Sequence, residues 1–207
     1  MLDFVQFQGH DFSMRGMSAL DSGAASGGAH LLSFAGTDTI SGIAWLEQYY
    51  NANIEKELVG TSIPATEHSV MCAYGRDEFA SYKRIITEVY PKGFVSIVSD
   101  TWDLWKVISD VITPLKDTIM ARDGKVVIRP DSGTPEDIVC GDPNGDTELK
   151  RKGVIESLWD IFGGTINSKG YKQLDPHIGC IYGDSITLER CRTICERLER
   201  KGFASTN

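Results

Sequence analysis

The stretches FVSIVSD (94–100) and KVVIRPD (125–131) share one form: a short apolar run that leads into an aspartate. Three further runs resemble them: LLSFAGTD, TSIPATEH and IGCIYGD, which close at Asp38, His68 and Asp184. Successive closing residues are 30, 32, 31 and 53 positions apart. About 30 residues is the length of a strand–helix–strand unit. Short Val/Ile-rich runs between helical segments are typical of parallel strands buried on both faces.

The spacing predicts an α/β fold with a parallel (β/α) barrel of about five strand–helix units. A closed barrel needs about eight such units, so we expect an incomplete barrel with exposed sheet edges. Residues 1–207 are predicted to form part of one domain. The long last step is explained by a surface insertion and small hairpin within 140–176, where a charged turn-rich loop (140–153) precedes FGGTINSKGYKQLDP (162–176).

Apolar periodicity predicts four helical segments. They are 37–50, with Ile40, Ile43, Ala44 and Leu46 on one face; 67–90; 101–121, broken near Pro114; and 187–201, with an apolar stripe of Leu188, Cys191, Ile194, Cys195 and Leu198. A Thr/Asp cap is expected to open the first of them. Cys191 and Cys195 favour buried packing over a metal or redox role.

Composition limits the function classes. The net charge is −8, which argues against generic binding to nucleic acid or to anionic membranes. No apolar stretch approaches the ~20 residues of a membrane-spanning helix, and MLDFVQFQGH lacks the pattern of a signal peptide. The five cysteines include no CxxC pair, which indicates reduced thiols and a cytoplasmic protein.

Each strand-end residue has a structural and a functional interpretation. In IRPDSG (128–133), Arg129 and Asp131 either form an ion pair in a polar turn, or bind a carboxylate or phosphate and sugar hydroxyls. His68 is either a hydrogen-bonded structural histidine, or a nucleophile or proton carrier steadied by a carboxylate such as Asp100. Asp38 either caps the helix that follows it or faces a ligand.

Two other segments offer groups that suit a ligand. His10, Asp11, Phe12 and Arg15 combine aromatic rings with a cation, which is weak evidence when taken alone. The pair Gly183–Asp184 ends the fifth run, where backbone N–H groups before a helix N-terminus are suited to an anion.

Seven motifs occur in an order and spacing that resemble the nicotinamide phosphoribosyltransferases. They are HDFSMRG, GTDT, PATEHS, SIVSD, IRPDSG, NSKGYK and IYGDS, and they run from about residue 9 to the C-terminus. The chain is similar, more distantly, to nicotinate phosphoribosyltransferase. The resemblance implies the barrel of the type II phosphoribosyltransferases and transfer of phosphoribosyl from phosphoribosyl pyrophosphate to nicotinamide. It also implies Mg²⁺, stimulation by ATP, and a homodimer or a complementing subunit.

The resemblance also implies roles for residues that bind nicotinamide and phosphate. Phe12 would stack on the pyridine ring, and Asp38 would accept a bond from the carboxamide. Arg129 would lie against the ring and amide, while Arg15 would contact phosphate. Gly183, followed by Asp184, would offer its backbone N–H to the phosphate.

The implied catalytic residues lie in three motifs. His68 would be phosphorylated by ATP with Asp100 as its carboxylate partner, and Asp131 would hold the ribose hydroxyls; metal ligands are not implied. The chain departs from the family at Gly179, where an arginine is expected. It also lacks the N-terminal segment that supplies a second ring-stacking aromatic residue and the glycine-rich phosphate loop. We therefore expect a central piece of the enzyme; the alternatives are a nicotinate-specific enzyme, or a truncated or split chain that binds only ligand or a partner subunit.

Overall fold

The computed structural model describes residues 5–207, which divide into two compact units, one ending at Ile63 and one running from Pro64 to Ser205. The first unit holds η1 (Val5–Phe7), β1 (His10–Asp11), η2 (Ser13–Gly16), α1 (Leu20–Leu31), β2 (Gly36–Thr37) and α2 (Ile40–Tyr50). The second holds α3 (His68–Cys72), α4 (Glu78–Arg84), η3 (Ile85–Val89), β3 (Val95–Val98), α5 (Leu104–Lys106), η4 (Val107–Ile112), α6 (Lys116–Met120), β4 (Val126–Arg129), α7 (Pro135–Cys140), α8 (Glu148–Phe162), β5 (Gly164–Ile166), β6 (Lys172–Leu174), β7 (Ile178–Cys180) and α9 (Leu188–Arg200). The fold is therefore mixed α/β.

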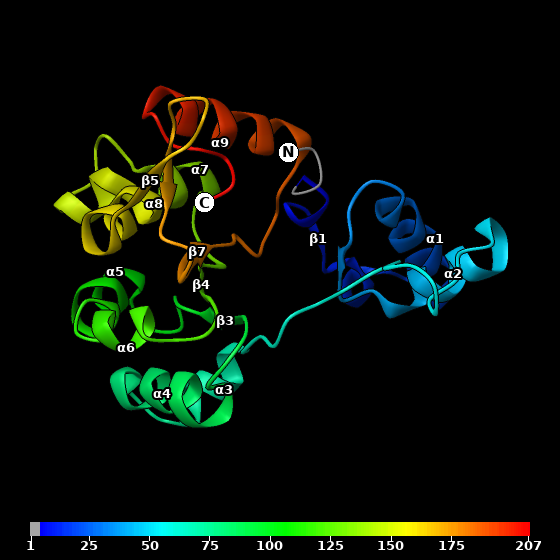
Figure 1. The fold of residues 1–207 in the computed structure, drawn as a ribbon, viewed down its shortest axis with the longest axis horizontal. Helices are drawn as coiled ribbons and strands as arrows, with labels where there is room; N and C mark the ends of the chain where they lie inside the picture. Colours follow the sequence, from blue (N-terminus) through cyan, green and yellow to red (C-terminus); the bar gives the residue numbers. More distant parts are fainter. Residues whose placement is uncertain (1–4) are drawn as a thin grey trace. The chain divides into compact units, whose positions relative to one another are not determined.

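In the first unit, glycines allow α1 and α2 to pack closely. A Cβ on Gly42 would lie 2.6 Å from the carbonyl carbon of Gly27, and a Cβ on Gly28 would lie 2.4 Å from the ring of Trp45. The two helices lie side by side in Figure 1. The parallel pair β1–β2 places His10 opposite Gly36, and Thr61 continues this pairing from the far side of Gly36. The predicted strand 31–38 is thus real but short.

In the second unit, three parallel strands are ordered β3-β4-β7. The segment 64–66 extends this sheet, because Ser96 donates to Pro64 O (2.9 Å) and Thr66 N–H donates to Ser96 O (3.0 Å). Four of the five predicted runs therefore lie side by side in chain order, and every one points its carboxyl end toward the same edge. The sheet is parallel, as predicted, and within residues 5–207 it does not close into a barrel.

Helices cover this central sheet, with α3–α6 on one side of the strands and α7–α9 on the other in Figure 1. Strand residues Val95, Ile97, Val126, Ile128 and Ile178 are completely buried. Helix residues that pack into the same core include Ile86, Ile108, Ile112, Ile119, Val154 and Leu158. Burial on both faces explains why β3 and β4 are mostly apolar and do not alternate between apolar and exposed polar residues.

The predicted helix 67–90 is wrong as a single element. The chain forms α3, turns at Gly75 (φ 62°), and resumes as α4, which is capped by the Asp77 carboxylate on Ala80 N–H (3.0 Å). It then passes into the π-helical turn η3. Glycine tolerates the left-handed backbone that ends a helix, so Gly75 divides the apolar pattern. The predicted break near Pro114 is confirmed, since α6 begins at Lys116.

Two predicted apolar faces are not buried within this structure. Of the predicted face of α2, Leu46 is buried, whereas Ile40 is 76% exposed and Ala44 is exposed too; the Thr39 N-cap makes no side-chain bond. Helix α9 is confirmed, but Leu188 is 91% exposed and Cys191 and Cys195 are exposed too. The prediction that these cysteines are buried is therefore wrong for this structure: α9 buries only Leu198 fully.

The stretch 140–176 is not a surface insertion throughout. Only its first part matches the predicted loop, because α8 begins at Glu148 and buries Val154, Ile155 and Leu158 in the core. Gly153 (φ 81°) interrupts that helix, where an added Cβ would lie 2.2 Å from Gly141 N. The hairpin is confirmed, with Gly164 paired to Leu174.

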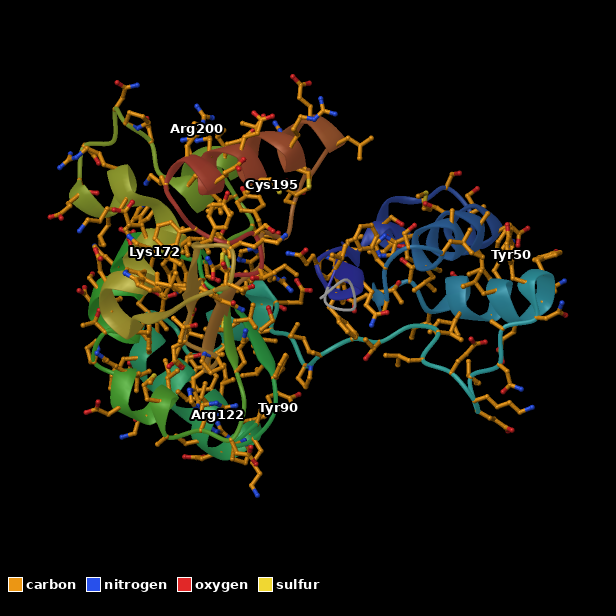
Figure 2. All side chains as sticks on the ribbon, turned by 45° about the horizontal axis from the view of Figure 1, so that its top comes forward. Tyr50, Tyr90, Arg122, Lys172, Cys195 and Arg200 are labelled. Atoms are coloured by element: carbon orange, nitrogen blue, oxygen red, sulfur yellow. The ribbon has the colours of Figure 1, made fainter. Side chains whose placement is uncertain are left out.

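Arg122 forms hydrogen bonds near the amino-terminal ends of the strands. Its guanidinium donates to Ile86 O, to Tyr90 O (2.8 Å) and to Gly93 O (3.2 Å), and it lies beside Tyr90 in Figure 2. Burial lowers the pKa of this guanidinium. Arg122 thus holds the end of η3 against the residues that lead into β3.

No helix in residues 5–207 has the length and apolarity needed to cross a bilayer.

Candidate active site at the carboxyl ends of the strands

The structure brings together the residues that close three neighbouring strands of the second unit. His68 Nε2 lies 3.6 Å from Asp131 Oδ2 and 3.9 Å from Asp100 Oδ1. The His68 side chain is 44% exposed, whereas that of Asp100 is only 6% exposed. The predicted pairing of His68 with Asp100 is therefore present as an electrostatic contact, with Asp131 as a second and slightly closer carboxylate.

Asp100 fixes the turn that follows β4. Its Oδ2 accepts the Asp131 backbone N–H (2.8 Å) and the Ser132 hydroxyl. Its Oδ1 is buried and has no hydrogen-bond partner among the described residues. Because a buried carboxylate oxygen without a partner is costly, this atom is suited to a ligand donor or to the His68 N–H. The Asp100 carboxylate thus holds the 131–132 turn with Oδ2, while Oδ1 is available to accept a further hydrogen bond.

The surroundings of His68 assign its tautomer. Two carboxylates face Nε2, and negative charge there favours a proton on Nε2. The Thr101 hydroxyl lies 3.1 Å from Nδ1 and donates to it in that tautomer. Thr101 was not predicted from the sequence, although its place directly after Asp100 in the motif would have suggested it.

Arg129 is 5% exposed at the end of β4. Its Nη2 lies 3.5 Å from Glu67 Oε2 on the neighbouring segment. The charge of the guanidinium is thus balanced from the strand that carries His68. Asp131 remains 25% exposed and faces His68.

Gly183 is where β7 joins this group. An added Cβ would lie 2.4 Å from Asp131 Oδ1. Its N–H donates to Pro130 O (3.1 Å), so the N–H predicted to hold phosphate is already engaged within the protein. Asp184 accepts the Ser185 hydroxyl (2.7 Å) in the following turn. A larger residue here would force the Asp131 carboxylate to shift, because that carboxylate lies against the Gly183 backbone.

The hydroxyl of Tyr182 lies near several of the strand-end carboxylates. Its hydroxyl donates to Gly133 O (3.1 Å), which joins the β7 end to the loop after Asp131. Burial raises the pKa of Tyr182 to about 12, and the nearby charges of Asp100, Asp184 and Asp131 add to this rise. Three of the predicted strand-end aspartates therefore act on one phenol. The acidic group of the second unit extends from β3 to β7.

The first unit holds a separate group around His10. His10 Nε2 lies 3.0 Å from Asp38 Oδ1, and the His10 ring lies 4.5 Å from the ring of Phe12. Ser62 also donates to Asp38 Oδ1 (2.5 Å). Both bonds end on Oδ1, so Oδ2 of this 42% exposed carboxylate faces no protein donor within residues 5–207. Phe12 and Asp38 are thus brought together, and His10 is the residue that joins them.

Arg15 and Asp11 lie near this group in sequence, but one is exposed and the other is buried. Arg15 is exposed in the short helix η2. Asp11 is buried and accepts the Ser13 N–H (2.8 Å), which shapes the turn that carries Phe12. Burial pushes the pKa of Asp11 up, but bonds from Ser13 and Thr39 outweigh it and leave that pKa lowered. Asp11 belongs to the cluster identified in the sequence, where no individual role was predicted for it.

Gly179 lies inside β7 opposite Val127, four residues before Gly183. A Cβ there would meet the Lys125 side chain, with Cδ at 3.3 Å. At about 3.3 Å per residue, this position is well away from the strand ends. A side chain at residue 179 would therefore extend toward Lys125 and not toward Asp131.

Metal-ligating side chains do not form a cage here. Within residues 5–207, no group of three or more His, Cys, Asp or Glu side chains is placed to hold a metal ion. Mg²⁺ commonly uses one or two carboxylates together with substrate phosphates and water. Asp100 and Asp131 are the carboxylates at the strand ends that could serve as such ligands.

In α/β enzymes the active site lies at the carboxyl ends of parallel strands, which is where this sheet gathers its polar side chains. The family model for the nicotinate phosphoribosyltransferase (NAPRTase) family matches residues 7–207, and the chain belongs to that family. The predicted resemblance to phosphoribosyltransferases is thereby confirmed.

Curated relatives agree with this assignment. The chain is 50% identical to the nicotinamide phosphoribosyltransferase of Acinetobacter baylyi over 214 aligned residues, which cover 100% of this chain and 42% of the relative. It is 42% identical to that of Mycoplasma pneumoniae (99% and 43% covered) and 38% identical to that of Xanthomonas campestris (98% and 40% covered). The chain thus spans less than half the length of these relatives.

Proposed function

We propose that the chain takes part in phosphoribosyl transfer from phosphoribosyl pyrophosphate to nicotinamide, which gives nicotinamide mononucleotide and pyrophosphate in NAD salvage. The observation that carries this proposal is the convergence of His68, Asp100 and Asp131 at the strand ends. Membership in the phosphoribosyltransferase family and the names of the relatives support it. We also propose that the strands belong to a type II phosphoribosyltransferase barrel, and that the protein is a cytoplasmic homodimer.

The residues divide the work by chemistry. Departure of pyrophosphate from the anomeric carbon builds positive charge on the ribose, and the Asp131 carboxylate would stabilise that charge and hold the hydroxyls. Arg129 would lie against the nicotinamide amide and ring, and Arg15 would bind phosphate. Phe12 would stack on the pyridine. No strong general base is needed, because the pyridine nitrogen attacks with its own lone pair.

Mg²⁺ and ATP would each assist the reaction in a different way. Mg²⁺ would neutralise the charge of the leaving pyrophosphate, with Asp100 and Asp131 as the residues of this chain nearest in type and place. ATP would phosphorylate His68, whose ring is held by Thr101 on one side and faces two carboxylates on the other. The negative phosphate would be repelled by those carboxylates, so the phosphorylated histidine would be high in free energy. Its hydrolysis could then be coupled to the phosphoribosyl transfer.

The direct test is formation of nicotinamide mononucleotide by this chain. Nicotinamide, phosphoribosyl pyrophosphate and Mg²⁺ are supplied with and without ATP, and the product is quantified chromatographically. Product above the level of an Asp131→Ala control supports the proposal. A folded chain that gives no product contradicts activity in this chain and leaves ligand or partner binding as its function.

Asp38 is expected to set the preference for nicotinamide over nicotinate. Its Oδ2 is the acceptor for a carboxamide N–H, a charge-assisted bond worth about 1.5–3 kcal/mol, while nicotinate would bring one carboxylate against another. Asp38→Asn should therefore lower the ratio of kcat/KM for nicotinamide to that for nicotinate by at least about tenfold. The measurement is kcat/KM for both substrates.

Ser62→Ala is the matched control for Asp38. It removes one donor to Asp38 Oδ1 and keeps the negative charge that distinguishes amide from acid, so the amide-to-acid ratio should stay within about twofold of the parent. An unchanged ratio in Asp38→Asn would show that Asp38 does not read the amide.

His68→Ala should remove stimulation by ATP and spare part of the basal rate. The variant loses the phosphorylated ring but keeps Asp131 and Arg129 for the transfer itself. Rates with and without ATP measure the effect. His177→Ala is the control, because His177 pairs with Asp175 (2.6 Å) outside the strand-end group. Complete loss of basal activity in His68→Ala would contradict this role.

A further inference from the structure

One buried hydroxyl lies beneath the strand-end group and is bonded to three elements. Ser99 directly follows β3, directly precedes Asp100, and is completely buried. Its backbone N–H donates to Arg129 O (2.9 Å), and its Oγ accepts the Arg129 N–H (3.3 Å). Ser99 is therefore hydrogen-bonded to both the backbone N–H and the backbone C=O of Arg129. These bonds lie at the point where the side chains of Arg129 and Asp100 leave the sheet.

The hydroxyl of Tyr82 completes the bonding of Ser99. Ser99 Oγ donates its proton to Ile97 O (2.7 Å), and the Tyr82 phenol lies 2.8 Å from Ser99 Oγ. A hydroxyl has one proton to give and two lone pairs to receive with. Ile97 O only accepts and Arg129 N–H only donates, so Tyr82 must be the second donor. The three partners use the whole capacity of Ser99.

Tyr82 belongs to α4, which also supports the helix that carries His68. Tyr82 is completely buried, and its neighbour Ser81 contacts Met71 Sδ (3.8 Å) in α3. Burial raises the pKa of Tyr82 well above its ordinary value, so its proton stays in place. One turn of α4 thus reaches both α3 and the ends of β3 and β4.

We infer that Tyr82 and Ser99 are positioning residues, which set the placement of Asp100 and Arg129 for the transfer reaction without touching the substrate. This inference rests on the proposed function for its activity readout. Losing the Tyr82 hydroxyl leaves Ser99 with an unused lone pair and frees the 99–101 turn to shift. A shift there moves Asp100, and through Asp100 it moves the 131–132 turn.

Tyr82→Phe is the test, because it removes one oxygen and keeps the ring in the core. Ser157→Ala is the matched control: Ser157 is equally buried and donates to Gly153 O (2.7 Å) in α8. Both variants should lower Tm to a similar degree. Tyr82→Phe alone should lower kcat, by about five- to tenfold as expected for one hydrogen bond, with the KM for nicotinamide within about twofold.

A purely structural role for Tyr82 would lower Tm in both variants and leave kcat within about twofold of the parent, which would overturn the inference. A second readout does not depend on activity: Tyr82→Phe should shift or broaden the His68 imidazole C–H signals in the NMR spectrum, and Ser157→Ala should not. If the parent forms no nicotinamide mononucleotide, the proposed function fails and this spectrum decides the inference, with unshifted signals overturning it. Ser99→Ala carries the same readouts should Tyr82→Phe not fold.

Discussion

Replacing Gly183 with alanine is expected to lower formation of nicotinamide mononucleotide by at least about 100-fold, because displacing a positioned group by about 1 Å has an effect of that size. The added Cβ would lie 2.4 Å from Asp131 Oδ1, closer than real atoms approach. Asp131 is the group that yields, since it is a side chain at a partly exposed strand end. It would then leave the place where it faces His68 and where, in the proposed reaction, it would hold the ribose.

Gly179→Ala is the control for Gly183→Ala, as it adds the same methyl group four residues earlier, within β7. Its Cβ would meet only the Lys125 side chain, at 3.3 Å, and a flexible side chain can move aside. Activity should remain within about threefold of the parent, because volume changes are tolerated where neighbours can adjust. Equal activity in both variants would show that close contact between Gly183 and Asp131 is not needed.

The strand ends were predictable because burial on both faces leaves a strong record in the sequence. FVSIVSD and KVVIRPD are mostly apolar until the strand leaves the core, with Ser96, Ser99 and Arg129 as buried polar exceptions, so Asp100 and Asp131 mark the boundary. Parallel pairing then brings those boundaries to one edge. His68 follows the same logic although its segment makes only isolated pairing with β3.

Contacts between residues distant in sequence were not predictable in this way. His10 and Asp38 are 28 positions apart, and nothing in either motif indicates that one imidazole joins Phe12 to Asp38. Tyr82 appears in the sequence as an ordinary core aromatic residue, because its hydroxyl gains meaning only from Ser99. Sequence patterns identify burial, whereas hydrogen-bond partners depend on the packing of separate elements.

Helix burial failed where amphipathicity alone was used. The stripe on α9 predicts a buried face, yet Leu188 and Cys191 are exposed because only the end near Leu198 meets other elements. A periodic pattern shows which face is apolar, but the neighbouring elements decide whether that face is covered. Gly75 and Gly153 similarly divide helical patterns through positive φ angles, which periodicity does not record.

Asp100→Asn is expected to have the second large effect, a loss of about 100-fold in the ATP-stimulated rate together with reduced stability. Asp100 Oδ2 accepts two donors, and Oδ1 faces His68 Nε2. An amide has one oxygen, so its NH₂ must face either the Asp131 N–H and Ser132 hydroxyl or the His68 N–H. Each orientation sets donor against donor, and losing a charged hydrogen bond costs about 1.5–3 kcal/mol.

Asp103→Ala separates this effect from simple destabilisation. Asp103 accepts the Trp105 N–H (3.1 Å) as the cap of α5, three residues beyond Asp100, and it takes no part in the strand-end group. Its loss should cost about 1 kcal/mol of stability and leave the ATP-stimulated rate within about twofold. Thermal unfolding and rates with and without ATP, measured on both variants, distinguish the two. Equal rate losses would mean that the carboxylate of Asp100 serves only the turn, and that His68 works without it.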